Sequence, residues 1–105
     1  MDPVTLSSTR DDLQILDVRD PYEWRAGRID GSVHIPLHEL SARVGEIEGG
    51  RPVAVICRSG NRSALATSWL RQRGVDAHNV DGGMVAWSIH GLPLTAEDGR
   101  VGRVA

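Results

Sequence analysis

Residues 52–63 read PVAVICRSGNRS and decide the fold of this 105-residue chain. The short apolar run, rich in β-branched residues, predicts a buried strand that ends at the only cysteine, Cys57. A small polar loop follows, and Ala64, Leu65, Trp69 and Leu70 then recur at helical spacing up to Gly74. The order strand, loop, helix therefore places Cys57 just before the N-terminus of a helix.

The residues around Cys57 predict a reactive thiolate rather than an inert core thiol. Unpaired backbone amides and the positive end of a helix dipole favour an anion at this position. Arg58 and Arg62 add positive charge, and Gly60 permits a tight turn of the backbone. Small polar residues complete a ring of N–H donors, although they also suit capping of the helix: Ser59, Asn61 and Ser63. The thiolate is the nucleophilic form of cysteine.

Composition excludes several classes of function. The net charge of −2 gives no general affinity for nucleic acid or an anionic membrane, so any anion binding is local. All twelve basic residues are arginine, which excludes Schiff-base chemistry on lysine. A single cysteine suits a reducing compartment. Neither a secretory leader nor an apolar run of about 20 residues is recognisable, so we expect a cytoplasmic, soluble protein.

The rest of the chain alternates strand and helix patterns, which predicts one α/β domain with a small, largely parallel sheet and helices on both faces. The expected strands are Val4–Leu6 as a weak edge strand, Leu13–Val18, Val33–Ile35, the run before Cys57, and Asp76–Val80. The expected helices are Pro21–Ala26, Leu37–Val44, the one that starts near Ala64, and Met84–Ile89. We expect the domain to span residues 1–95 and residues 96–105 to form a flexible tail.

Two charged residues lie where the first convincing strand ends, at the edge where ligands bind in parallel sheets. Asp17 and Arg19 are expected to pair with each other or with a loop residue and so brace the site. The four histidines lack the spacing of metal ligands, so no metal site is expected from them: His34, His38, His78 and His90.

Four groups of residues, in this order and spacing, resemble the rhodanese-homology family and in particular its single-domain sulfurtransferases. They are Leu16-Asp17-Val18-Arg19 with Glu23 and Trp24, Gly27 to Ser32 with Ile35-Pro36, Cys57 to Ser63, and Gly82-Gly83 with Ala86-Trp87 and Gly91-Leu92-Pro93. The sequence departs from the family at Arg28, where histidine is usual.

The resemblance implies a rhodanese-like domain in which Cys57 is the catalytic nucleophile and cycles through a persulfide. Backbone amides from Arg58 to Ser63 would cradle the sulfur, with the two arginines attracting the donor. The implied partners are a small anionic sulfur donor such as thiosulfate and a thiophilic acceptor, either cyanide or a thiol, including a protein thiol. No metal or organic cofactor is implied.

Two alternatives stay open at this point. Four residues separate Cys57 from Arg62, whereas the phosphatases that resemble this family have one more, which widens the cradle for a tetrahedral phosphate. The shorter loop favours a single sulfur atom over a phosphate. The other alternative is a sulfur-relay or regulatory module whose main role is to bind a protein.

Overall fold

The structure is a computed structural model that describes residues 1–105. Its core is a four-stranded sheet in the order β2-β1-β3-β4, and every neighbouring pair is parallel. The strands are β1 (Gln14–Asp17), β2 (Val33–His34), β3 (Val53–Ile56) and β4 (Ala77–Asn79). The α-helices are α1 (Pro3–Thr9), α2 (Pro21–Ala26), α3 (Leu40–Arg43), α4 (Asn61–Gln72) and α5 (Gly83–Ile89). Short 3₁₀ segments are η1 (Arg10–Asp12), η2 (Leu37–Glu39) and η3 (Val44–Glu46). The predicted α/β class and parallel sheet are confirmed.

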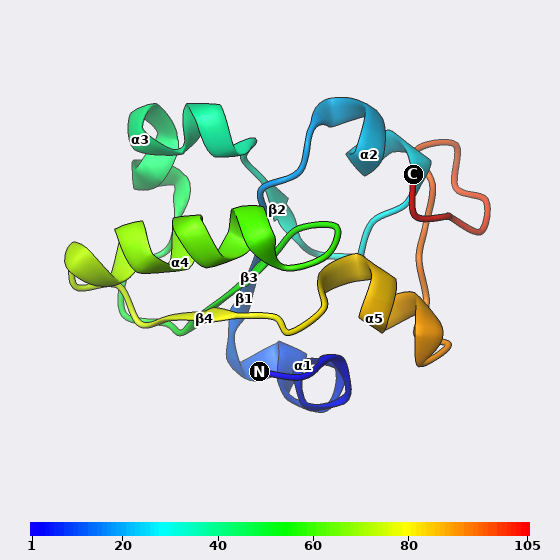
Figure 1. Ribbon diagram of the computed structural model, residues 1–105, viewed down its shortest axis with the longest axis horizontal. Helices are drawn as coiled ribbons and strands as arrows, with labels where there is room; N and C mark the ends of the chain where they lie inside the picture. Colours follow the sequence, from blue (N-terminus) through cyan, green and yellow to red (C-terminus); the bar gives the residue numbers. More distant parts are fainter.

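Helices cover both faces of the sheet, and β3 shows how the sequence divides between them. Side chains alternate across a strand, so Ala54 and Ile56 join one apolar cluster, whereas Val53, Val55 and Cys57 join the other. The first cluster includes residues of α1 and α5, and the second includes residues of α3 and α4. Figure 1 shows these two pairs of helices on opposite sides of the strands. Cys57 therefore lies on the α4 side.

The predicted edge strand at Val4–Leu6 is wrong, because these residues lie in helix α1. The Asp2 carboxylate caps the helix by accepting a hydrogen bond from the Thr5 amide at 2.9 Å, and Pro3 occupies its first turn. Leu6 is fully buried against the core. Val4 and Leu6, two positions apart, fit either a strand or a helix, and the Asp2 cap favours the helix.

The predicted helix at Leu37–Val44 exists only in pieces. The chain forms η2, a single turn of α-helix in α3, and η3 in succession. Leu40 is nonetheless buried, as its place on the predicted apolar face required. The other predicted strands and helices are present with ends that differ by a few residues.

Residues after α5 fold back toward α2 (Figure 1). The Gly102 amide donates to the Leu94 carbonyl, and the Arg103 amide donates to the Ala26 carbonyl, each at 2.9 Å. Val104 packs against the cluster that holds Trp87. The flexibility of residues 96–105 stays a prediction, and these contacts identify the part of the chain whose hydrogen exchange would test it.

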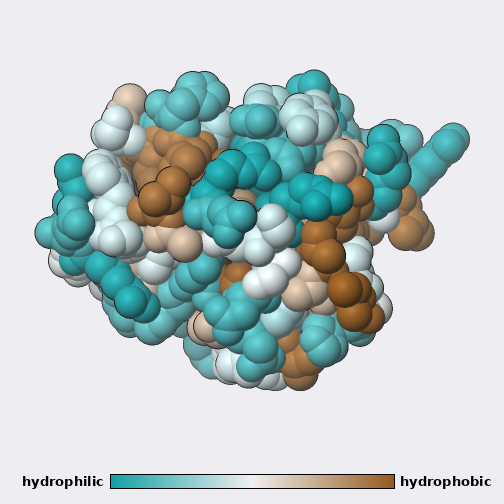
Figure 2. Space-filling model, viewed as in Figure 1, coloured by the Kyte–Doolittle hydropathy of each residue, from teal (hydrophilic) through white to brown (hydrophobic).

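The longest helix, α4, has 12 residues, and none of the helices combines the length and apolarity that crossing a membrane requires. On the face that carries α4, Figure 2 shows a largely hydrophilic surface with separate apolar areas beside α3 and over α5. The most exposed large apolar side chains on these helices are Leu65 of α4, at 67%, and Ile89 of α5, at 78%.

Candidate active site

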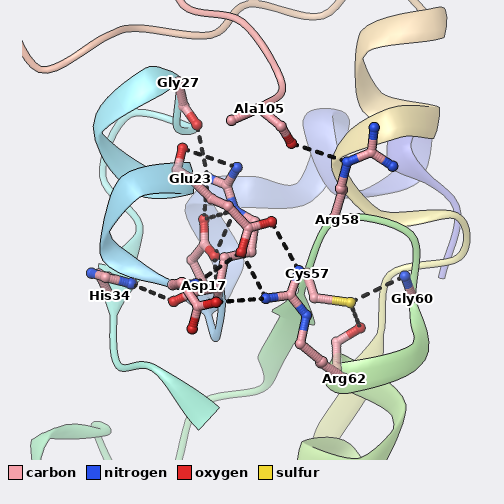
Figure 3. A network of polar contacts seen from close by, with 12 residues as sticks. Asp17, Glu23, Gly27, His34, Cys57, Arg58, Gly60, Arg62 and Ala105 are labelled. Atoms are coloured by element: carbon pink, nitrogen blue, oxygen red, sulfur yellow. Dashed lines mark hydrogen bonds and ion pairs between the residues drawn. The ribbon is translucent and has the colours of Figure 1, made fainter.

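The candidate site lies at the carboxyl end of β3, in the loop that joins it to α4. Cys57 Sγ accepts a hydrogen bond from the Gly60 amide at 3.1 Å and lies 3.2 Å from Ser63 Oγ (Figure 3). Gly60 has a φ of 107°, a left-handed conformation that glycine adopts without a steric penalty. This turn directs the Gly60 amide back to the sulfur.

The thiol is enclosed, because Cys57 is only 1% exposed. Burial raises the pKa of Cys57, but the Ser63 hydroxyl and the backbone amides of Ser63, Gly60 and Ser59 lower it by more. The pKa of the Cys57 thiol therefore lies below its ordinary value. Hydrogen bonds, rather than exposure to solvent, favour the thiolate here.

Helix α5 holds the other side of the same loop. The Met84 amide donates to the Cys57 carbonyl at 2.9 Å, and the Val85 amide donates to the Arg58 carbonyl at 3.0 Å. Gly83 makes this approach possible, since a Cβ at that position would lie 2.3 Å from the Cys57 carbonyl oxygen. Helix α5 thus holds the loop in place through the carbonyls of Cys57 and Arg58.

Asn79, which the sequence analysis did not select, connects two residues of the loop. Ser63 Oγ donates to Asn79 Oδ1 at 2.6 Å, and Asn79 Nδ2 donates to the Gly60 carbonyl at 3.2 Å. Asn79 ends β4, the neighbour of β3, so both strands deliver these residues to one edge of the sheet. A polar residue at that strand end was the available signal.

Arg62 forms an ion pair with Glu23 of α2. Glu23 is the second residue near the site that was not selected from the sequence. The two guanidinium nitrogens bind the two carboxylate oxygens at 2.7 and 2.9 Å. Asp20, at 3.9 Å, is a more distant partner. The hydrogen bonds with Glu23 raise the pKa of the Arg62 guanidinium. The Glu23 side chain is buried, with 1% of its surface exposed. A buried glutamate three residues after Asp20 also completes the capping box of α2, which was a readable signal.

The Asp17 and Arg19 side chains pair with each other, the first of the two predicted arrangements. Arg19 Nε and Nη2 bind the Asp17 carboxylate at 2.8 to 3.0 Å, and both side chains are almost completely buried. The same guanidinium donates to the carbonyls of Glu23 and Gly27. The pair therefore fastens α2, and with it the partner of Arg62, to the end of β1.

The side chains of the remaining loop residues do not converge on the sulfur. Arg58 is exposed, and its Nε donates to the Ala105 carbonyl oxygen at 3.0 Å, on the tail side of the loop (Figure 3). Ser59 and Asn61 are exposed and make no side-chain hydrogen bond. The N-cap of α4 is Gly60, so capping by a side chain, the alternative role for Ser59, Asn61 and Ser63, is not found.

Two surface cavities, each of about 420 Å³, lie elsewhere. One is lined in part by Arg51 and Pro52 just before β3, and the other by Gln14 at the start of β1. Both adjoin the amino ends of strands, whereas ligands of parallel sheets bind beyond the carboxyl ends. We therefore place the candidate site at Cys57 and not in either cavity.

The ion pair of Glu23 makes stability depend on pH. Burial raises the pKa of Glu23, but hydrogen bonds from Arg62 and the Asp20 amide, with the charges of Arg62 and Arg19, bring it below the ordinary 4.5. The ionised carboxylate therefore stabilises the fold above that pH, and this contribution is lost as pH falls through the folded pKa. Urea unfolding from pH about 6 to about 3 should show a steeper loss for the wild type than for Glu23→Gln. Parallel profiles would contradict this role.

Comparison with known proteins identifies the family of the chain. Residues 3–90 match the family described as the Rhodanese-like domain. A protein named "Sulfurtransferase" from Allochromatium vinosum is 39% identical over 85% of this chain and 84% of its own length. A thiosulfate sulfurtransferase, GlpE, from Pseudomonas aeruginosa is 35% identical over 70% of this chain and 68% of its own.

A solved structure agrees with the sequence relatives. The crystal structure of a rhodanese-related protein from Thermoplasma volcanium superposes with a TM-score of 0.89 and 36% identity, covering 92% of this chain and 97% of that one. The chain therefore belongs to the rhodanese-like family, and its sequence relatives include proteins named as sulfurtransferases.

Proposed function

We propose that this protein is a sulfurtransferase that carries sulfane sulfur as a persulfide on Cys57. The observation that carries the proposal is the hydrogen bond from the Gly60 amide to Cys57 Sγ, in a loop with four residues between Cys57 and Arg62. Preorganised amides stabilise an anionic sulfur without having to reorient when charge develops. The names of the relatives support the same reaction class.

The proposed reaction has two displacement steps. The Cys57 thiolate attacks the sulfane sulfur of thiosulfate; a new S–S bond forms, the old one breaks, and its electron pair leaves with sulfite. A thiophilic acceptor, cyanide or a thiol, then attacks the outer sulfur of the persulfide, and the Cys57 thiolate is regenerated. Arg58 and Arg62 are proposed to attract the anionic donor, with Ser59, Gly60, Asn61 and Ser63 lining the loop that receives it. Neither step needs an oxidant.

Intact mass spectrometry tests this proposal. After incubation with thiosulfate, the wild type should gain one sulfur atom that cyanide removes, and Cys57→Ala should gain none. Release of phosphate from an aryl phosphate with no sulfur gain would favour the phosphatase instead. A protein captured on Cys57, with negligible turnover of small molecules, would favour a relay or regulatory module.

The ionisation of Cys57 provides a separate prediction. Because its hydrogen bonds lower the pKa of Cys57, the rate of alkylation by iodoacetamide should reach half its maximum below the ordinary thiol value of about 8.5. The same protein unfolded in urea is the control and should titrate at the ordinary value. Coinciding profiles for folded and unfolded protein would show that the loop does not activate the thiol.

A further inference from the structure

We propose that Asn79 is a positioning residue that controls how readily Cys57 ionises, because it competes with the sulfur for the hydroxyl proton of Ser63. Ser63 is completely buried and has one O–H. Two acceptors lie within its reach: Asn79 Oδ1 at 2.6 Å and Cys57 Sγ at 3.2 Å. One hydroxyl proton cannot serve both, so the protonation state of the sulfur and the direction of the hydroxyl are linked.

The orientation of the Asn79 amide follows from its second partner. The Gly60 carbonyl accepts only, so the nitrogen of Asn79 must face it, at 3.2 Å, and the oxygen must face Ser63. Asn79 therefore presents an acceptor to Ser63 and cannot present a donor. The Ser63 hydroxyl is drawn away from Cys57.

Following each proton shows which state Asn79 favours. In the thiol, the S–H donates to Ser63 Oγ, the Ser63 O–H donates to Asn79 Oδ1, and Asn79 Nδ2 donates to the Gly60 carbonyl. In this arrangement Ser63 Oγ, Asn79 Oδ1 and the Gly60 carbonyl each accept a hydrogen bond. In the thiolate, the hydroxyl either stays on Asn79 with its lone pairs toward the charged sulfur, or turns to the sulfur and leaves Asn79 Oδ1 without a donor. Both arrangements cost free energy, so Asn79 stabilises the thiol.

The consequence for transfer rests on the proposed function. The inner sulfur of a Cys57 persulfide carries neither a proton nor the charge, so Ser63 stays on Asn79 while the outer sulfur holds the charge. Asn79 thus penalises the thiolate and leaves the persulfide unaffected, which favours the sulfur-loaded form of the protein.

A double-mutant cycle on alkylation tests the proposal without any sulfur donor, so its outcome is independent of whether the protein transfers sulfur. Asn79→Leu frees the Ser63 hydroxyl for the thiolate and should move the midpoint of the iodoacetamide profile about one pH unit lower. Ser63→Ala removes the donor and should move it higher. In the Ser63→Ala background, Asn79→Leu should have no further effect.

The double-mutant cycle distinguishes an effect of Asn79 through Ser63 from an effect through the Gly60 carbonyl. If Asn79 acted through the Gly60 carbonyl, its replacement would move the midpoint equally in both backgrounds, and that result would overturn the proposal, as would a midpoint that rises in Asn79→Leu. Asn79→Ala removes the same acceptor and serves if leucine prevents folding. The charged side chains linked to the Cys57 loop are unchanged in all variants: Arg58, Arg62, Asp20, Glu23, Asp17 and Arg19. Helix α5 carries none.

Discussion

Replacing Arg19 by methionine is expected to lower the free energy of unfolding by about 3–5 kcal/mol. The substitution leaves the Asp17 carboxylate, 1% exposed, without its ionic partner. It also removes the donors that the Glu23 and Gly27 carbonyls accept from. Methionine approximates the length of arginine, so a large cavity is avoided and the loss reports the buried charge. Urea unfolding with an unchanged m-value is the measurement.

The double variant Asp17→Asn/Arg19→Met is the matched control for this prediction. It removes both charges. The asparagine oxygen can still accept the hydrogen bond that the Asp17 carboxylate accepts from the backbone amide of residue 19, at 3.1 Å. Much of the lost stability should return, since a buried pair is costly to break but less costly to replace as a whole. A loss below about 1 kcal/mol for Arg19→Met alone, typical of an exposed ion pair, would show that the pair is solvated in solution.

Gly83→Ala is expected to lower the free energy of unfolding by about 2–5 kcal/mol and to displace the loop that holds Cys57. Its φ of 59° is unfavourable for alanine by about 1–2 kcal/mol, and the forced overlap adds about 1–3 kcal/mol. The overlap is with backbone, since the added Cβ lies 2.3 Å from the Cys57 carbonyl oxygen and 2.7 Å from that of Arg58. Because the loop must shift, the midpoint of Cys57 alkylation should move as well.

Gly74→Ala separates the two contributions. Gly74 has a similar conformation, with a φ of 81°, but nothing lies within 4 Å of an added Cβ. Its alanine variant should lose only the conformational part and keep the wild-type alkylation profile. Equal losses of stability in the two variants, with Cys57 unaffected in both, would contradict close packing of α5 on the loop.

The parts of the fold that local sequence encodes were predictable. The apolar run before Cys57 forms β3, the Gly60 turn precedes α4, and the alternation of elements produces the parallel sheet. The failures occur where local signals are ambiguous. The spacing of Val4 and Leu6 fits both a strand and a helix, and the Asp2 cap favoured the helix. The apolar spacing from Leu37 to Val44 is compatible with a continuous helix, but the chain divides there into η2, α3 and η3.

The candidate site was predictable as far as the loop and the Asp17–Arg19 pair. The sequence selected Cys57 together with all of Arg58 to Ser63, and of these the structure brings Gly60 and Ser63 into hydrogen bonds with the sulfur. Glu23 and Asn79 were not selected; they are 39 and 16 residues from their partners along the chain. The capping box and the polar strand end mark these two residues in the sequence. Their partners in the loop depend on how α2 and β4 pack around it, which local patterns do not specify.

Because side chains alternate along β3, the side of the sheet on which the sulfur lies depends on whether an odd or even number of residues precedes it in the strand. Val53, Val55 and Cys57 share one side of the sheet, and Ala54 and Ile56 share the other. Inserting or deleting one residue in this strand would turn the sulfur toward Trp87 and separate it from the Ser63 hydroxyl. Substitutions in β3 that keep its apolar alternation leave the sulfur on the α4 side of the sheet, whereas a change of length by an odd number of residues does not.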